Sequence, residues 1–173
     1  MNTEDLALEH GDYTVIDRNG TQLLMFKSGK VYRWSKCRGW KCVSNTANRT
    51  DGYNQIIVGR KEDNNLQPFY RHRLMGYAFL NLDIDDPKLQ IDHIDGNRLN
   101  NHIDNLRIVT HQQNHFNRTT AKGYYIMPNN KYKAYICACN KLHHLGYYDT
   151  EEEARQAYLQ AKIMYHPIVN VIV

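Results

Sequence analysis

The chain has 173 residues, and its 22 Lys and Arg against 18 Asp and Glu give a formal net charge of +4. This length suits one domain or two small ones, and the mild positive charge is compatible with a polyanionic partner without requiring one. The sequence contains no apolar run of the roughly 20 residues that a membrane span needs. Residues 1–11 also lack the basic start and apolar run of a secretion signal. We therefore expect no membrane association and a cytoplasmic location.

Alternating, strand-like runs fill most of the first 70 residues. Four of them, separated by Gly, Asn and Asp, lie at 13–16, 23–26, 31–34 and 55–58. Such runs are typical of strands joined by turns. Residues 71–80 break the alternation, and the spacing of Leu74, Ala78 and Phe79 predicts a short helix there.

The four cysteines lack the spacing of metal ligands. They form neither a CxxC pair nor a regular zinc pattern, and lie at Cys37, Cys42, Cys137 and Cys139. We expect reduced thiols in a reducing compartment.

A carboxylate and an imidazole stand side by side in the segment 90–97. Asp92 and His93 lie between apolar residues and precede a turn rich in Asp, Gly and Asn. Residues 104–109 resemble a returning strand, which a helix carrying Asn114 follows. A hairpin packed on a helix would bring Asp92 and a residue of the first helical turns to one point.

These residues can supply the chemistry of phosphodiester hydrolysis. An imidazole whose pKa lies near the working pH suits a base that deprotonates water, which is the role we assign to His93. Carboxylate and amide oxygens suit one Mg²⁺ or Mn²⁺ ion, so Asp92 and Asn114 could hold the metal. Asn105, across the hairpin, could bond the loop backbone and keep the base in position.

The segment 52–118 resembles the HNH endonucleases, specifically the homing type encoded by phages and introns. The resemblance rests on ordered elements, namely Gly52-Tyr53, Arg71-His72-Arg73-Leu74, Ile91 to Asn97, Asn100-Asn101, Asn105-Leu106-Arg107 and Val109 to Asn114. It implies that His93 is the general base, that Asp92 and Asn114 bind one metal ion, and that Asn105 is structural. Many relatives carry histidine at the last position, so an asparagine there implies weak, water-rich magnesium binding.

Two other residues of this segment keep open roles. His72 lies in the upstream Arg-His-Arg element, where both a role near the scissile phosphate and a packing or backbone-bonding role fit. Arg107 is interpreted as a phosphate or structural contact rather than a catalyst.

Three strand-like runs, near 123–127, 131–138 and 142–147, precede a helix in the last third of the chain. Thr150 with Glu153 predicts a capping box at the start of this helix. Helical spacing gives it one small apolar face, formed by Ala154, Ala157, Tyr158 and Ala161. Strand alternation places alternate side chains toward that helix, namely Tyr132, Ala134, Ile136 and Ala138.

Residues 122–166 resemble the DNA-binding domain of plant ethylene-response factors. The shared residues are Gly123, Pro128, Lys131 to Ile136, Leu145 to Thr150, Glu152 to Ala154, Ala157 and Tyr158. The resemblance implies a three-stranded antiparallel sheet on one helix, with its outer face in the DNA major groove. The DNA-facing positions would be Tyr125, Met127, Lys131, Lys133, Tyr135, Cys137 and His144. Plant domains carry several arginines there, so the base preference does not transfer.

The sequence therefore predicts an α+β protein with three segments, which are a β-rich region over 1–51, a ββα-metal nuclease domain over 52–120 and a sheet-and-helix DNA-binding domain over 121–173. The expected partner is double-stranded DNA, with no small-molecule substrate, and the expected state is a monomer or homodimer, in the host cytoplasm if a phage encodes the chain.

Two alternatives are a DNA-binding protein with an inactive nuclease site and a zinc-binding module. The N-terminal region either extends the DNA surface or is a solvated basic face, with candidate phosphate contacts at Arg33, Lys36, Arg38 and Lys41.

Overall fold

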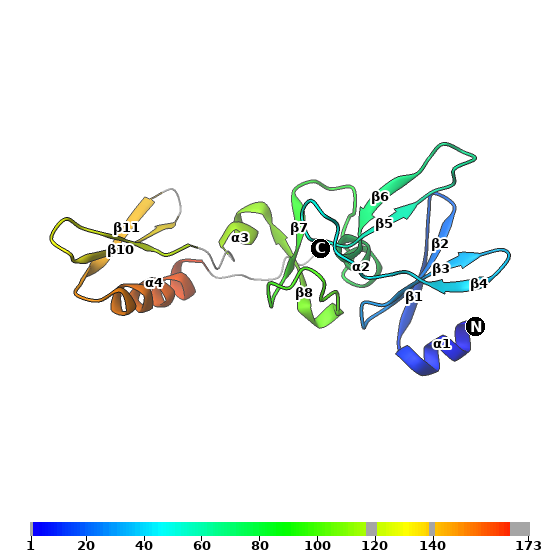
Figure 1. Cartoon of the computed structure of the whole chain (residues 1–173), viewed down its shortest axis with the longest axis horizontal. Helices are drawn as coiled ribbons and strands as arrows, with labels where there is room; N and C mark the ends of the chain where they lie inside the picture. Colours follow the sequence, from blue (N-terminus) through cyan, green and yellow to red (C-terminus); the bar gives the residue numbers. More distant parts are fainter. Residues whose placement is uncertain (1, 117–120, 139–140, 167–173) are drawn as a thin grey trace. The chain divides into compact units, whose positions relative to one another are not determined.

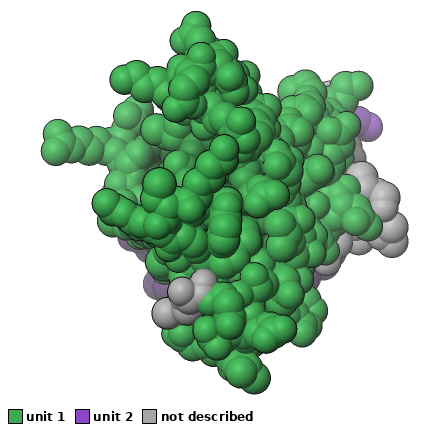
Figure 2. All heavy atoms as spheres, turned by 90° about the vertical axis from the view of Figure 1, so that its right-hand side faces the viewer, with its two compact units in different colours: residues 1–110, 170–173 green, residues 111–169 purple. Residues whose placement is uncertain are grey.

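A computed structural model describes residues 2–116, 121–138 and 141–166 (Figure 1). It combines several small antiparallel sheets with helices, which confirms the expected mixture of α and β elements. Two compact units divide the chain after Thr110, and Figure 2 colours them separately. None of the helices within the described residues is long and apolar enough to cross a membrane.

Unit 1 begins with a helix and a four-stranded sheet. Helix α1 (Thr3–His10) starts at Asn2, which forms a capping box with Asp5. The sheet has the order β1-β2-β3-β4, with the strands β1 (Tyr13–Arg18), β2 (Thr21–Phe26), β3 (Val31–Ser35) and β4 (Gly39–Cys42). Strand β2 is buried on both faces, because Leu23 and Met25 enter the main core of the unit while Leu24 and Phe26 pack under α1. The sequence predicted the first three strands but neither α1 nor β4.

The rest of unit 1 is built from two hairpins and a helix. Strands β5 (Gln55–Val58) and β6 (Gln67–Tyr70) pair, helix α2 (Arg71–Phe79) follows, and β7 (Leu89–His93) pairs with β8 (Leu106–Thr110) after the short 3-10 helix η1 (Ile103–Asn105). Helix α2 confirms the helix predicted over 71–80. One core joins all these elements to the N-terminal sheet, through Ile16, Leu23, Met25, Val31, Ile56, Val58, Leu74, Met75, Ile91 and Ile108.

A buried arginine links the N-terminal sheet to α2. Arg71 is 1% exposed, and its Nε donates to the side-chain oxygen of Asn54 at 2.7 Å. Its two terminal nitrogens donate to the backbone oxygens of Gly29 (2.9 Å), Val43 (2.8 Å) and Ser44 (2.7 Å). These four bonds offset the desolvation of the guanidinium and tie the β2–β3 turn and the segment between β4 and β5 to the start of α2.

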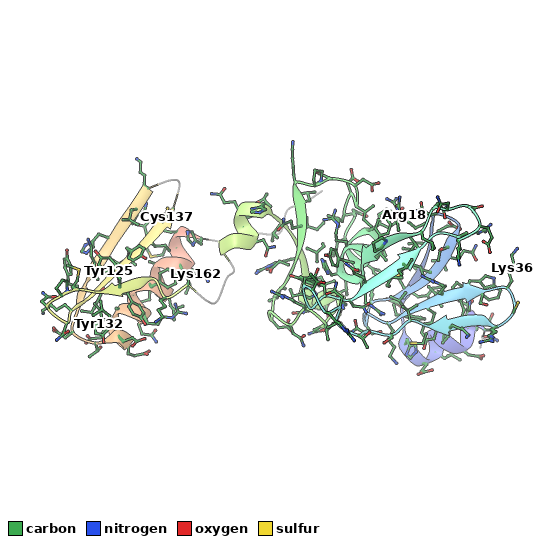
Figure 3. The ribbon with its side chains drawn as sticks, turned by 45° about the horizontal axis from the view of Figure 1, so that its top comes forward. Arg18, Lys36, Tyr125, Tyr132, Cys137 and Lys162 are labelled. Atoms are coloured by element: carbon green, nitrogen blue, oxygen red, sulfur yellow. The ribbon has the colours of Figure 1, made fainter. Side chains whose placement is uncertain are left out.

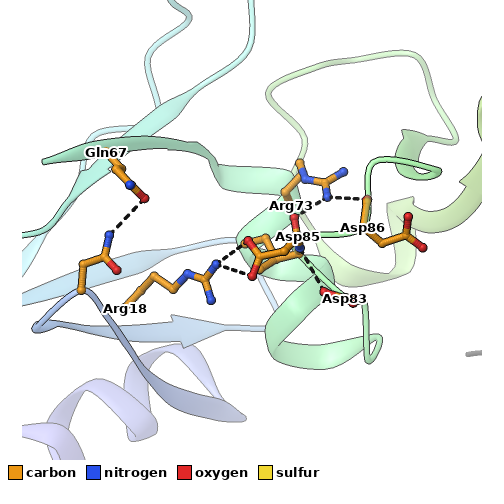
Figure 4. Close-up of polar contacts among 8 residues, drawn as sticks. Arg18, Gln67, Arg73, Asp83, Asp85 and Asp86 are labelled. Atoms are coloured by element: carbon orange, nitrogen blue, oxygen red, sulfur yellow. Dashed lines mark hydrogen bonds and ion pairs between the residues drawn. The ribbon is translucent and has the colours of Figure 1, made fainter. Parts of the chain in front are cut away.

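Two further arginines stabilise the loop after α2 (Figure 4). Arg18 at the end of β1 donates to both carboxylate oxygens of Asp85, at 2.7 and 2.9 Å. Arg73 on α2 donates to the backbone oxygens of Ile84 (2.6 Å), Asp86 (3.3 Å) and Leu89 (2.9 Å). The loop that leads into β7 is therefore fixed from two sides.

Unit 2 contains the short helix α3 (His111–Phe116) and a three-stranded antiparallel sheet with α4 (Glu151–Tyr165) packed on it. The strand order is β11-β10-β9, with β9 (Tyr124–Ile126), β10 (Tyr132–Ala138) and β11 (Lys141–Tyr148). The predicted capping box of Thr150 and Glu153 is present. The predicted faces are also confirmed, because Ala134, Ile136 and Ala138 are buried while Cys137 is exposed.

A glycine lets the start of β9 lie against α4. Gly123 has a φ of +77°, and a Cβ at this position would lie 2.0 Å from a ring carbon of Tyr158. Any other residue at this position would require a shift of Tyr158 or of the backbone, and would also be strained by the positive φ.

The thiols of Cys37, Cys42 and Cys137 are free, as expected. Cys139 and residues 117–120, which precede the predicted domain boundary at 121, lie outside the described residues.

Candidate active site

The hairpin β7–β8 places Asp92 and His93 at the end of a strand inside unit 1. Asp92 is 7% exposed and His93 is 4% exposed. Because side chains alternate along a strand, the two groups point to opposite faces of the hairpin. Their cross-strand partners are Arg107 and Leu106. A tight turn follows, in which Gly96 donates its backbone N–H to the carbonyl of His93 at 2.9 Å.

Arg107 holds the carboxylate of Asp92. Its Nε and a terminal nitrogen donate to the same oxygen, Oδ2, at 2.8 and 2.7 Å. Only 16% of the Arg107 side chain and 8% of the Asp92 side chain are exposed. Arg107 therefore fixes the orientation of this carboxylate. The sequence left two roles open for Arg107, a phosphate contact and a structural contact, and its bonds to Asp92 are a structural contact.

The hydrogen bonds of His93 define its neutral tautomer. Nε2 lies 3.3 Å from the side-chain oxygen of Asn101, whose own amide nitrogen donates to the carbonyl of Leu99 at 3.1 Å. Since that oxygen can only accept, Nε2 carries the hydrogen and the lone pair of the neutral ring lies on Nδ1. Burial lowers the pKa of His93, so the ring is neutral near pH 7.

His72 packs in a cluster of rings beside His93. Its centroid lies 5.2 Å from the ring of His93, 4.8 Å from Tyr53 and 5.3 Å from Tyr70, on which it stacks. His72 is 8% exposed, and its burial lowers its pKa to about 3. It is thus a neutral residue that packs against the ring of His93.

Asn105 fixes the loop after β7 by three hydrogen bonds of its side chain. Its oxygen accepts the backbone N–H of Asp95 at 3.0 Å, and its nitrogen donates to the carbonyl of Asn100 at 2.8 Å and to Oδ1 of Asp95 at 2.9 Å. The backbone carbonyl of Asn105 also accepts the N–H of Ile94 at 2.9 Å. These are the backbone contacts that the sequence led us to expect of this asparagine.

The predicted metal ligands combine a carboxylate and an amide. Asp92 lies on β7 of unit 1, whereas Asn114 is a half-buried residue of α3 in unit 2, so their pairing stays a prediction. Within the described residues no three His, Cys, Asp or Glu side chains form a group that could hold a metal ion. Two oxygen donors suit a hard divalent cation that keeps several waters, and not zinc.

The outer face of the sheet in unit 2 carries a cluster of aromatic and basic side chains. Lys133 on β10 lies over the rings of Tyr125 (5.7 Å) and Tyr147 (5.8 Å), which are its cross-strand neighbours. Tyr135 is 5.7 Å from Tyr125, and the ring of His144 is 4.7 Å from that of Tyr147. Hydrogen bonding to Tyr125 raises the pKa of Lys133, which therefore stays cationic.

Four predicted DNA-facing residues thus meet in one place, with Tyr147 as a member that sequence reasoning missed. Strict alternation along β11 would place Tyr147 on the face opposite His144, and a shift of the strand register between the two residues brings both to the outer face. Cys137 is exposed farther along β10, and Figure 3 labels it together with Tyr125. Lys131 instead pairs with Asp149 at 2.8 Å, and Met127 lies in the turn that leads into β10, where its backbone bonds that of Lys131.

Comparison with known proteins identifies the part of the chain that carries the hairpin. Residues 69–116 match the model of a family described as HNH endonuclease. An uncharacterised HNH endonuclease of Acanthamoeba polyphaga mimivirus is 42% identical over 73 residues, which are 40% of this chain and 39% of that protein. The SPbeta prophage protein YosQ of Bacillus subtilis, named as an HNH homing endonuclease, is 47% identical over 49 residues, which are 28% of this chain and 27% of that protein.

A solved structure that describes DNA binding and cleavage by the HNH homing endonuclease I-HmuI has a TM-score of 0.49 and 29% identity, and covers 61% of this chain and 56% of that one. The chain spans less than half the length of each curated relative it matches. On the family model and these relatives, the chain contains an HNH endonuclease domain, in which the hairpin of Asp92 and His93 lies.

Proposed function

We propose that the chain is a metal-dependent DNA endonuclease that hydrolyses phosphodiester bonds, with His93 as the base that activates water. The observation that carries this proposal is the position of the buried Asp92–His93 pair inside the residues that match the HNH endonuclease model. Double-stranded DNA would be the substrate, as proposed from the resemblance to the homing type.

The surroundings of His93 suit a general base. Its neutral ring has the lone pair on Nδ1, which can accept a proton from water, while Asn101 keeps the Nε2–H bond. The packing of His72 against the ring and the bonds of Asn105 to the following loop restrict its movement. We assign His93 the catalytic step, and His72 and Asn105 the positioning of His93.

Asp92 and Asn114 would hold one Mg²⁺ or Mn²⁺ ion. The ion would stabilise negative charge on the phosphate and the leaving oxygen. Arg107 contributes by orienting the Asp92 carboxylate through its two hydrogen bonds. An amide as second ligand adds no charge, so we expect weak binding that needs millimolar metal.

The sheet of unit 2 would bind the DNA major groove. Lys133 would contact a phosphate, and the other predicted DNA-facing side chains would contact phosphates or base edges, namely Tyr125, Met127, Lys131, Tyr135, Cys137 and His144. Support comes from the exposed cluster around Lys133 and from the resemblance to ethylene-response factors. Arg107 would contact DNA only by giving up its bonds to Asp92.

One observation favours a second function, a DNA-binding protein with an inactive nuclease site. The ion pair of Arg107 with Asp92 engages the carboxylate that the metal would need. Metal-dependent cleavage discriminates between the two functions.

The test is cleavage of supercoiled plasmid by wild type and by His93→Ala, with magnesium and with EDTA. A matched control is His102→Ala, which removes an exposed histidine of the loop before β8. We expect metal-dependent cleavage by wild type and the control and none by His93→Ala. A nicked product would indicate a monomer acting on one strand, and a linear product a homodimer or a second cleavage event. Equal cleavage by His93→Ala would reject the assigned base, and binding without cleavage by wild type would favour the second function.

A further inference from the structure

The positive charge of the chain comes from one acid-free segment. Residues 18–50 contain eight Lys and Arg and no Asp or Glu, which leaves 14 Lys and Arg against 18 Asp and Glu in all other positions. This segment spans β2, β3 and β4 of the N-terminal sheet. Without it, the chain would carry a net negative charge.

Most of these cations have no acidic partner. Arg18 pairs with Asp85 and Lys27 with Asp12. Among the described residues, ion pairs involve none of the other six, which are Lys30, Arg33, Lys36, Arg38, Lys41 and Arg49. Arg33 and Lys41 are direct cross-strand neighbours on β3 and β4, so two like charges face each other.

Arg33 is the least satisfied of the six. Its side chain is half-buried, and its Nε has neither exposed surface nor a hydrogen-bond partner among the described residues. Burial lowers the pKa of its guanidinium. A desolvated cation beside another cation is unfavourable unless an anion binds to it.

The side chain of Arg33 lines a pocket of about 660 Å³ in unit 1. Lys36 and Arg60 add two cations to its wall, and Asp17 and Glu62 are the two acids. Asp17 is engaged locally, because its carboxylate accepts the N–H of Gly20 at 3.1 Å in the β1–β2 turn. Trp34, which is 45% exposed, also lines the pocket.

We propose that this pocket and the β3–β4 hairpin bind phosphate groups of the DNA backbone, with Arg33 and Lys36 as the central contacts. Phosphate chemistry fits because guanidinium and ammonium groups donate charge-assisted hydrogen bonds to phosphate oxygens. A polymer fits better than a free nucleotide because Arg38 and Lys41 continue the cationic surface along the exposed hairpin, and Lys36 extends outward from it (Figure 3). The choice of DNA rests on the proposed nuclease function.

Salt-dependent binding tests this surface. Binding of a labelled 30-base-pair duplex of arbitrary sequence is measured by anisotropy in EDTA, over a range of salt concentrations, for wild type, Arg33→Gln and Lys36→Gln. Each phosphate contact contributes about 0.9 to the slope of log affinity against log salt, so each variant should lower that slope by about one. Lys30→Gln, an exposed cation of the same segment outside the pocket, is the matched control and should keep the wild-type slope. Lys36 is exposed, so its variant will fold even if Arg33→Gln does not.

Trp34 supplies a direct readout. The chain has two tryptophans, so Trp40→Phe leaves Trp34 as the only one. Titration with duplex DNA should then change the fluorescence of Trp34, with the same midpoint concentration as the change in anisotropy. A change caused by ATP but not by duplex would overturn the assignment to DNA in favour of a free nucleotide. Equal slopes in all four proteins, with plasmid cleavage intact, would reject this surface alone. Absence of duplex binding and of cleavage in wild type would reject the nuclease function and this surface together.

Discussion

Arg107 and Asp92 face each other across the β7–β8 ladder, and both hydrogen bonds of the guanidinium go to one carboxylate oxygen, at 2.8 and 2.7 Å. The pair is mostly buried, so removal of the cation would leave a desolvated carboxylate without its partner. We expect Arg107→Gln to lower the free energy of unfolding by about 3 kcal/mol, measured by urea denaturation at pH 7.

The matched control for this variant is Arg18→Gln. Arg18 also makes two short hydrogen bonds to a carboxylate, both from one terminal nitrogen, but its partner Asp85 is 72% exposed. Exposed pairs contribute less than about 1 kcal/mol. Similar losses in both variants would show that burial of the Asp92 pair does not determine its contribution.

His72 should make the stability of the protein depend on pH. Its pKa falls from 6.5 to about 3 on folding, because burial disfavours the charged ring. Between these two values the unfolded chain binds a proton that the folded protein does not, so stability is full above pH 6.5 and decreases as the pH falls. The decrease is at most about 1.4 kcal/mol per pH unit.

The variant His72→Phe keeps a ring in the cluster and removes the titrating group. Urea denaturation of both proteins at pH 7, 6, 5 and 4 should give a steeper loss of stability for wild type. If the stability of the two proteins fell in parallel with pH, the pKa of His72 would not be lowered by folding.

Asn105 should determine the order of the loop that follows His93. Asn105→Ala removes three side-chain hydrogen bonds, for which we expect a loss of about 1–3 kcal/mol. Hydrogen exchange should show faster exchange of the Asp95 amide, and plasmid cleavage should decrease. Asn105→Asp should be worse, since it sets a second carboxylate against Asp95. Asn129→Ala, which removes a turn bond of unit 2, should leave the Asp95 amide unchanged.

Lys133 should contribute one phosphate contact of the sheet in unit 2. Lys133→Gln should weaken duplex binding uniformly across sequences and lower the salt slope by about one. Lys162 lies on α4, which packs against the opposite face of the sheet from Lys133, so Lys162→Gln should have no such effect. Equal effects of the two variants would indicate that charge in general, and not this face, attracts DNA.

The sequence was sufficient to predict the elements whose side chains alternate or repeat regularly. The runs of β1 to β3, helix α2 and the alternation of β10 have such patterns, as does the capping box of Thr150. Strand β4 was missed because its four residues, Gly39 to Cys42, alternate over too short a run to be distinguished from the turn at Gly39. Helix α1 had a capping signal, Asn2 with Asp5, but its apolar face is reduced to Leu6.

The partners within the site could not be predicted from the sequence. Arg71 and Arg73 stand in a basic motif that could equally contact phosphate, whereas in the structure both donate to backbone carbonyls of the same unit. The pairing of Arg107 with Asp92 depends on the strand register, which brings together residues 15 positions apart. Asn101 as partner of His93 depends on the path of a loop that no periodic pattern specifies.

The four hydrogen bonds of Arg71 bear on how the segment that carries the β7–β8 hairpin could be moved between proteins. A fragment that began at residue 52 would lose the carbonyls of Gly29, Val43 and Ser44. The guanidinium of Arg71 would then keep only one of its four partners, the side chain of Asn54. It would also expose Ile56 and Leu74, which core residues of the N-terminal sheet now cover. We therefore expect that the HNH segment, although recognisable in the sequence, does not fold without the N-terminal sheet, and that an exchange of this segment between proteins must include that sheet.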